Sequence, residues 1–155
     1  MMNMVVYCIP FYNGFLKMVI QEGFVTRLTY VEGDCQGGFD ESIPVVKKLL
    51  KYIDGEPVSF DDIPVKYLYG SEFDKRVWNI TRTIPYGEVR TYGWIAEKLG
   101  GVKYSRAVGN SLGRNPIMII VPCHRVVRSG GGLGGFSSVG GLELKEYLLR
   151  MEGVY

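Results

Sequence analysis

The residues of this chain whose types and spacing could do chemistry are Cys123 and His124. His124 is the only histidine in the 155 residues, and it directly follows a cysteine. The thiolate is the nucleophilic form of cysteine, and an adjacent base helps to form it. A cysteine after an apolar run is more often an inert core residue. Pro122 and Arg125 argue against a plain core strand here, because proline interrupts a sheet and arginine rarely lies in a core.

The segments on either side of this pair predict how it is positioned. An apolar, β-branched run over Ile117–Val121 predicts a buried strand that ends at the cysteine. Residues 129–141 contain seven glycines in thirteen positions and predict a tightly turning loop. The periodicity of Leu142–Met151 predicts a final helix.

Two short helices are predicted just before the apolar run. Thr91–Leu99 and Tyr104–Leu112 both have helical character, and Gly100 and Gly101 separate them. Two helices of this length joined by a short glycine turn are typical of a helix-turn-helix.

The N-terminal half predicts a small α/β unit with an antiparallel sheet. Its strands are expected at Met4–Pro10, Phe15–Ile20 and Phe24–Val31, the last two joined at Glu22-Gly23, and a helix with Ser42 as N-cap is expected at Ser42–Ile53. The proline-containing stretch 57–69 reads as a connector, which predicts two domains, residues 1–68 and 69–155. Ser71 and Asp74 form a capping pattern that predicts a helix at the start of the second domain.

Charge is divided unequally between the two halves. Residues 1–70 carry six basic and nine acidic side chains, whereas residues 71–155 carry twelve basic and seven acidic ones. The basic C-terminal half favours a polyanionic partner. No apolar run reaches membrane-spanning length, and no signal peptide is recognisable. An odd number of widely spaced cysteines does not predict a secreted disulfide framework, and whether Cys8 and Cys35 pair is left open. A reducing compartment, the cytoplasm or a nucleus, is therefore expected.

The hexapeptide PCHRVV, residues 122–127, resembles the acceptor-cysteine motif of the O6-alkylguanine-DNA alkyltransferase (methylated-DNA–protein-cysteine methyltransferase) family. Residues 71–92, 106–116 and 140–153 resemble the same family in the same order. The resemblance implies an α+β fold, with an RNase H-like N-terminal scaffold and a winged-helix-like C-terminal domain that carries the cysteine. It also implies DNA repair by base flipping, with irreversible, single-turnover transfer of the alkyl group from O6-alkylguanine to Cys123, and leaves O4-alkylthymine open as a second substrate.

The resemblance assigns catalytic roles to five residues. Cys123 accepts the alkyl group, and His124 links its thiol through water to Glu152, in the manner of a Cys-His-acid triad. Tyr92 matches the tyrosine that helps to protonate the leaving guanine. Asn115 matches the hinge between the recognition helix and the active-site loop.

Other positions match residues that contact the base or the DNA. Ser137 matches the residue that bonds guanine O6, with Ser138 as the alternative because the loop is longer here. Phe136 stands where many members have tyrosine, Lys145 matches a lysine near the tyrosine, and the backbone of Val126 is expected to face the base amine. Arg106 matches the arginine that fills the space of the flipped base. Ala107 would let the recognition helix approach the minor groove, while Lys103, Arg114 and Arg128 are expected at phosphates.

No cofactor and no metal are expected. Some family members carry a Cys/His zinc site, but Cys8 and Cys35 cannot supply four ligands and the only histidine lies in the active-site motif. The expected partner is double-stranded DNA containing O6-alkylguanine, bound by a monomer, with no membrane involved.

Three alternatives belong to other classes of protein. A non-catalytic protein that binds alkylated DNA would lack the cysteine, which is present. A helix-turn-helix regulator would leave the Cys-His pair unexplained. A cysteine hydrolase would leave the helix-turn-helix unused, and the sequence offers no recognisable oxyanion hole.

Overall fold

The computed structural model describes residues 3–155 and begins with a three-stranded antiparallel sheet. The strands are β1 (Met4–Phe11), β2 (Gly14–Gln21) and β3 (Phe24–Val31), in that spatial order. The hairpin predicted at Glu22 and Gly23 is confirmed, since both residues have positive φ, 52° and 84°. The N-terminal half is the antiparallel α/β unit that the sequence predicts.

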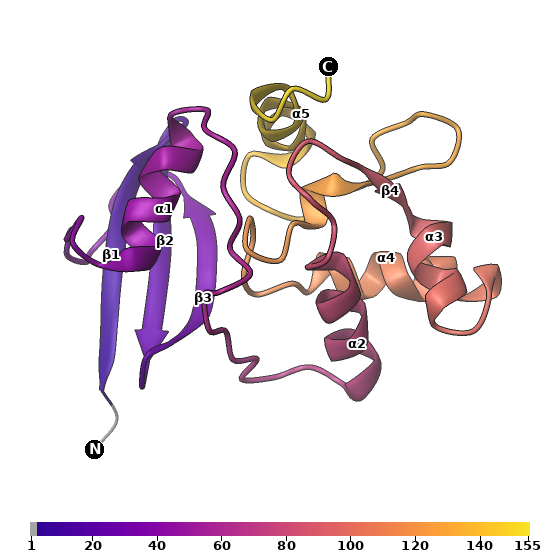
Figure 1. Cartoon of the computed structure of the whole chain (residues 1–155), viewed down its shortest axis with the longest axis horizontal. Coiled ribbons are helices and arrows are strands. Elements are labelled where there is room, and N and C mark those ends of the chain that lie inside the picture. The colour runs from indigo at the N-terminus through magenta and orange to yellow at the C-terminus, as the bar shows by residue number, and fades with distance from the viewer. Residues whose placement is uncertain (1–2) are drawn as a thin grey trace.

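Helix α1 (Pro44–Ile53) lies over one face of this sheet, in front of β1 and β2 (Figure 1). Its N-cap is Ile43, so the predicted cap at Ser42 is wrong. The hydroxyl of Ser42 donates to Asp40 instead, at 2.6 Å. Because the fixed φ of proline suits the first helical position, the helix begins at Pro44.

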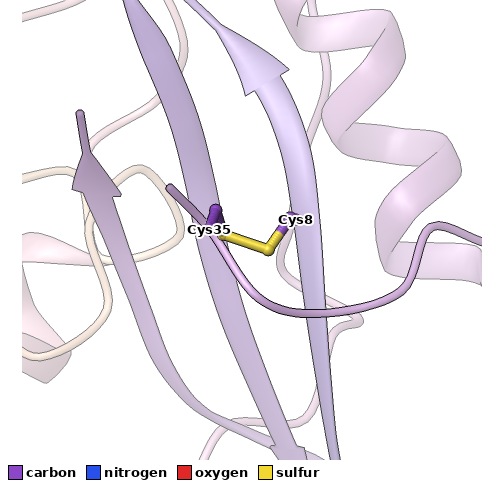
Figure 2. The surroundings of a disulfide bond; sticks show 2 residues. All are labelled: Cys8 and Cys35. Carbon is purple, nitrogen blue, oxygen red and sulfur yellow. A yellow bond between two sulfur atoms is a disulfide. The ribbon is translucent and has the colours of Figure 1, made fainter. Parts of the chain in front are cut away.

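A disulfide joins Cys8 on β1 to Cys35 in the loop that follows β3 (Figure 2). The backbone of the same loop pairs with β1, since Cys8 donates to the carbonyl of Gly38 at 2.8 Å and Gly38 donates to that of Val6 at 2.9 Å. The sequence alone left the pairing of these two cysteines open. The disulfide leaves Cys123 as the free thiol of the described residues.

The C-terminal half is mainly helical and carries the helix-turn-helix (Figure 1). Its helices are α2 (Glu72–Thr81), α3 (Tyr92–Lys98), α4 (Ser105–Gly113) and α5 (Gly141–Met151), with a 3₁₀ turn, η1 (Val102–Tyr104), before α4. The capping box of Ser71 and Asp74 is present as predicted. Gly100 and Gly101 connect α3 to α4 with φ of 127° and 146°, a region that residues with a Cβ rarely adopt.

The predicted strand at Ile117–Val121 is wrong. Only Ile117 pairs with a neighbour, in an isolated bridge to Leu28 on β3, and the chain then turns, with φ of 70° at Ile119. All five residues are buried, so their apolar character reflects burial in the core rather than a strand. The backbone of Leu28 bonds to Pro116 and Met118 at 2.9 Å each, which ties the N-terminal sheet to the segment before Cys123.

A short parallel pair that the sequence did not predict lies beside the cysteine. Strand β4 (Arg90–Thr91) pairs with β5 (Val126–Val127), which follows the 3₁₀ turn η2 (Cys123–Arg125). This pair connects the start of α3 to the residues after Cys123. One hydrophobic core, which includes Leu28, Val77 and Leu148, runs through both halves of the chain. No helix of residues 3–155 has both the length and the apolar content that crossing a bilayer requires.

Candidate active site

Cys123 lies at the wall of a cavity of about 830 Å³ between the two halves of the chain. The cavity is lined mainly by β3 from the N-terminal sheet, by α4 with the residues that follow it, and by the glycine-rich loop at 134–139, and Tyr69, Tyr92 and Arg128 complete its wall. Cys123 is partly buried and is the first residue of the 3₁₀ turn η2.

Behind the cysteine, His124 and Glu152 form a buried pair. Nε2 of His124 lies 2.6 Å from Oε2 of Glu152, and both side chains are inaccessible to solvent. Glu152 follows the last residue of α5 as its C-cap, so the helix delivers the carboxylate to the pair. The structure therefore brings together the histidine and the acid that the resemblance assigned.

Three further groups from different elements donate to Glu152. Arg125 bonds both carboxylate oxygens, through Nε at 2.8 Å and Nη2 at 3.1 Å. The backbone N–H of Gly87 donates at 3.1 Å, and the hydroxyl of Tyr52 donates at 2.5 Å. Burial alone would raise the pKa of Glu152, but the hydrogen bonds from His124 and Arg125 and the charge of Arg125 outweigh it and hold that pKa well below its usual range. Glu152 is therefore a carboxylate at neutral pH.

The His124 ring is neutral at neutral pH. Burial lowers its pKa, against the opposing effect of the Glu152 carboxylate. A neutral imidazole that donates from Nε2 to a carboxylate keeps Nδ1 as a proton acceptor. The pair can therefore take a proton from a neighbouring acid.

Two opposing influences act on the pKa of the Cys123 thiol. Burial raises its pKa, while the Asn115 amide and the positive charge of Lys145 favour the thiolate. The resting site thus holds a thiol that becomes a nucleophile when a base accepts its proton.

Asn115 joins the end of α4 to the segment before the cysteine. Its amide donates to the carbonyl of Val121 at 2.9 Å, and its carbonyl oxygen accepts from the backbone of Ile117 at 2.9 Å. These two bonds close the turns between 115 and 121. The hinge role of Asn115 stays a prediction.

Tyr92 and Lys145 lie close to each other beside the glycine-rich loop. Nζ of Lys145 is 5.9 Å from the centre of the Tyr92 ring. Lys145 is completely buried, and its ammonium donates to the carbonyls of Val126 at 2.7 Å, Leu133, and Gly135 at 3.2 Å. It therefore holds the loop in place and does not line the cavity itself. The carbonyl of Val126 is already engaged with Lys145, so it would have to accept a second bond to face a base amine.

The loop brings Phe136, Ser137 and Ser138 to the cavity wall. The hydroxyl of Ser138 donates to the carbonyl of Val139 at 2.8 Å, which leaves Ser137 as the less engaged hydroxyl. A Cβ at Gly113 would lie 3.1 Å from Oγ of Ser137, so the glycine that ends α4 allows the loop to approach the helix.

The basic residues expected at DNA are divided between the cavity and its surroundings. Arg106, Arg114 and Arg128 are exposed and line the cavity. Lys103 and Ala107 lie outside its lining, on η1 and α4, with Lys103 above the ring of Tyr104. Among residues 3–155, no group of three or more His, Cys, Asp or Glu side chains is arranged to hold a metal ion.

The sequence missed Tyr52 and the role of Arg125. Arg125 was visible only as an unusual charge beside the motif. Tyr52 follows Val45 and Leu49 at helical spacing, which marks it as a core position but does not reveal a partner 100 residues away.

A helix-turn-helix unit with a free cysteine in front of a buried His–Glu pair defines a DNA-binding protein with a nucleophilic thiol. The family described as 6-O-methylguanine DNA methyltransferase, DNA binding domain, matches residues 72–154. The methylated-DNA–protein-cysteine methyltransferase of Methanosarcina acetivorans is 54% identical over 108 residues, which cover 69% of this chain and 66% of that protein. The chain belongs to the methylated-DNA–protein-cysteine methyltransferase family, as the sequence motifs predicted.

Solved structures of the family have the same fold. The O6-methylguanine methyltransferase of Mycobacterium tuberculosis superimposes with a TM-score of 0.82 at 35% identity, over 97% of this chain and 93% of that one. The M. tuberculosis protein in complex with DNA superimposes with a TM-score of 0.81 at 36% identity, over 94% of this chain and 90% of that one. The matched part is about two thirds of the curated relatives' own length, 66% for M. acetivorans and 62% for Mycolicibacterium paratuberculosis.

Proposed function

We propose that the protein repairs alkylated DNA by moving the alkyl group of O6-alkylguanine to the sulfur of Cys123, once per molecule. The observation that carries this proposal is the position of the free Cys123 thiol. It faces a cavity lined by the recognition helix, with the buried His124–Glu152 pair behind it. O4-alkylthymine is a second substrate of the same chemistry.

The transfer is a displacement at the alkyl carbon. His124 accepts the Cys123 proton through a water molecule, and Glu152 stabilises the resulting imidazolium. The thiolate forms a sulfur–carbon bond as the carbon–O6 bond breaks, and the electron pair of that bond leaves with guanine. A thioether has no easy leaving group, so the cysteine is not regenerated.

Tyr92 supplies the proton that the departing guanine needs. Burial raises its pKa, with the nearby Cys123 acting in the same direction, so the phenol stays protonated at neutral pH. Ser137 bonds O6, the apolar wall includes Phe136, and Lys145 fixes the loop that carries both. Asn115 links α4 to the segment before Cys123.

The DNA partner is a duplex, bound through its minor groove by a monomer. Arg106 enters the stack in place of the flipped base, and Lys103, Arg114 and Arg128 contact phosphates. Ala107 allows close approach of α4. Poor sequence readout in the minor groove suits repair at any sequence.

Two expectations concern the whole chain. Residues 1–68 act as a scaffold for residues 69–155, which bind DNA and carry the acceptor. The protein works where the DNA is, in the cytoplasm of a prokaryotic cell or in the nucleus of a eukaryotic one.

The test is mass spectrometry after incubation with duplex DNA containing O6-methylguanine. One methyl group on Cys123 per molecule is expected, with none on Cys123→Ala and no second turnover in excess DNA. Tight binding of the lesion without any adduct would instead identify a non-catalytic alkylated-DNA-binding protein. Binding that ignores the lesion would identify a helix-turn-helix regulator.

A further inference from the structure

A residue of the N-terminal half reaches the buried acid–base pair. Tyr52, in the last turn of α1, is fully buried. Its hydroxyl donates to Oε2 of Glu152 at 2.5 Å and lies 3.4 Å from Nε2 of His124. The carboxylate oxygen that binds the histidine is therefore shared with a phenol from the other half of the chain.

Tyr52 is held as a hydrogen-bond donor. Burial raises its pKa well above the usual value, and the charge of Glu152 raises it further against the opposing effect of Arg125. Its O–H therefore stays protonated while Glu152 is a carboxylate. A donor to an anion lowers the affinity of that anion for other protons.

The other charged and titratable groups around this pair come from three elements. Arg125 of η2 binds both oxygens of Glu152, and Lys145 of α5 acts on His124 by its charge. Tyr86, before β4, packs its ring edge against Tyr52 with centroids 6.0 Å apart. Oε2 thus accepts from Tyr52, His124 and Arg125. Because the oxygen has only two lone pairs for three donors, Tyr52 and His124 compete for it.

We propose that Tyr52 is a positioning residue. It holds Glu152 in place and limits the pull of the carboxylate on the His124 proton, so that His124 stays neutral and ready to accept the Cys123 proton. The inference rests on the proposed function, and it gives the N-terminal half a direct part in activating the acceptor.

The predicted effect of Tyr52→Phe has a definite sign. Without the phenol, Oε2 of Glu152 attracts the His124 proton more strongly, so the pKa of His124 rises. At a pH between the His124 pKa of the parent protein and the higher one of Tyr52→Phe, His124 of the variant is already protonated and cannot accept a proton from Cys123. The acid limb of the pH–rate profile therefore moves to higher pH, which a purely structural loss would not cause.

Tyr86→Phe is a matched control. It removes a tyrosine hydroxyl from the neighbouring ring, but this hydroxyl bonds to the carbonyls of Gly55 and Met151, at 3.4 and 3.3 Å, rather than to Glu152. The substrate is free O6-benzylguanine, which needs neither DNA binding nor base flipping. We expect the acid limb of Tyr52→Phe to rise by about half a pH unit, which slows its reaction about threefold on the acid side of the profile, and we expect Tyr86→Phe to match the parent protein.

His124 is the only histidine, so its imidazole resonance in an NMR titration of untagged protein has one assignment. We expect the titration midpoint to rise in Tyr52→Phe and to stay in place in Tyr86→Phe. This readout does not require alkyl transfer. An unreactive parent protein would therefore overturn the proposed function alone, whereas an unmoved midpoint in Tyr52→Phe would overturn the role of Tyr52 alone.

A second substitution keeps the test decisive if Tyr52→Phe does not fold, as judged by its thermal melt. Incorporating 3-fluorotyrosine at position 52 retains the ring and the hydroxyl but makes the hydroxyl a stronger donor. The midpoint of His124 and the acid limb should then both move to lower pH. A shift to higher pH, or none at all, would overturn the proposal.

Discussion

The guanidinium of Arg114, just after α4, donates to the buried carboxylate of Asp74 on α2, with Nη2 2.7 Å from Oδ1. The hydroxyl of Ser111 donates to the same oxygen at 2.6 Å. The bond from Arg114 outweighs burial and, together with that from Ser111, holds the pKa of Asp74 well below its usual range. The end of the recognition helix is thereby fixed to α2. Because 54% of the Arg114 side chain remains exposed, its other N–H groups are free to meet a phosphate.

Asp74→Asn should destabilise the protein by about 2 kcal/mol at neutral pH. This free energy is what the charged hydrogen bonds to a buried carboxylate contribute, and it is reduced because Arg114 is half exposed. Since the folded-state pKa is depressed, the carboxylate stabilises the fold above about pH 4 and loses this effect as the pH falls further. Urea unfolding at neutral pH and at about pH 3 checks this.

The exposed Glu72, in the same helical turn, provides the control. Glu72→Gln should change the free energy of unfolding by less than about 0.5 kcal/mol. If the difference between the parent protein and Asp74→Asn were the same at both pH values, the ionised state of Asp74 would not be the source of its effect.

Arg106→Ala should slow the repair of duplex DNA far more than the reaction with free O6-benzylguanine. Only the duplex requires a base to be flipped, at a cost of a few kcal/mol. Arg106 is exposed on α4 at the cavity, whereas Arg76 is exposed on α2 away from it. Arg76→Ala removes the same charge and should leave the ratio of the two rates unchanged. Single-turnover rates on both substrates give the ratio, and equal losses on both would rule out base replacement by Arg106.

The parts of the site that could be predicted from sequence are those encoded locally. Cys123 and His124 are adjacent, the capping box needs only Ser71 and Asp74, and the turn of the helix-turn-helix needs Gly100 and Gly101. In each case the physical requirement is met within four residues, so the pattern is visible in the chain.

The parts that could not be predicted depend on contacts between distant segments. Nothing near Tyr52 indicates that its hydroxyl bonds to Glu152, and two-residue strands such as β4 carry no periodic pattern. The apolar run that begins at Ile117 predicts a strand that the structure does not contain, for a related reason. Burial by surrounding elements and strand pairing demand the same residue types, and only the tertiary structure separates them.

Lys145 should make stability depend on pH in the alkaline range. Burial lowers its pKa to about 8, against the opposing effect of Cys123. Between this value and the usual one near 10.5, the unfolded chain holds a proton that the folded chain has released, so the contribution of Lys145 to stability rises with pH. Relative to Lys145→Met, the parent protein should gain about 1–2 kcal/mol between about pH 8 and pH 9.5.

Urea unfolding of the two proteins at both pH values measures this gain, with Cys123→Ala in both so that the thiol coupled to Lys145 does not titrate; the other titrating groups cancel in the comparison. Lys47 is exposed on α1, so Lys47→Met should show no such gain. A constant difference between the parent protein and Lys145→Met would show that the buried ammonium keeps an ordinary pKa.

Alkylation of Cys123 should destabilise the fold. The adduct adds volume to a partly buried site between η2 and the end of α4, where Asn115 bonds to the backbone at 117 and 121. Packed interiors transmit such an insertion as strain, typically about 1–3 kcal/mol, which lowers the melting temperature of a chain of this size by several degrees. Thermal melts before and after reaction with methyl and benzyl donors measure the change. The benzyl adduct should melt below the methyl adduct, and both should melt below the free protein. Identical melting of alkylated and free protein would show that the cavity accepts the group without strain. If Asn115 transmits the strain, Asn115→Ala should reduce the difference in melting temperature between the methyl and benzyl adducts.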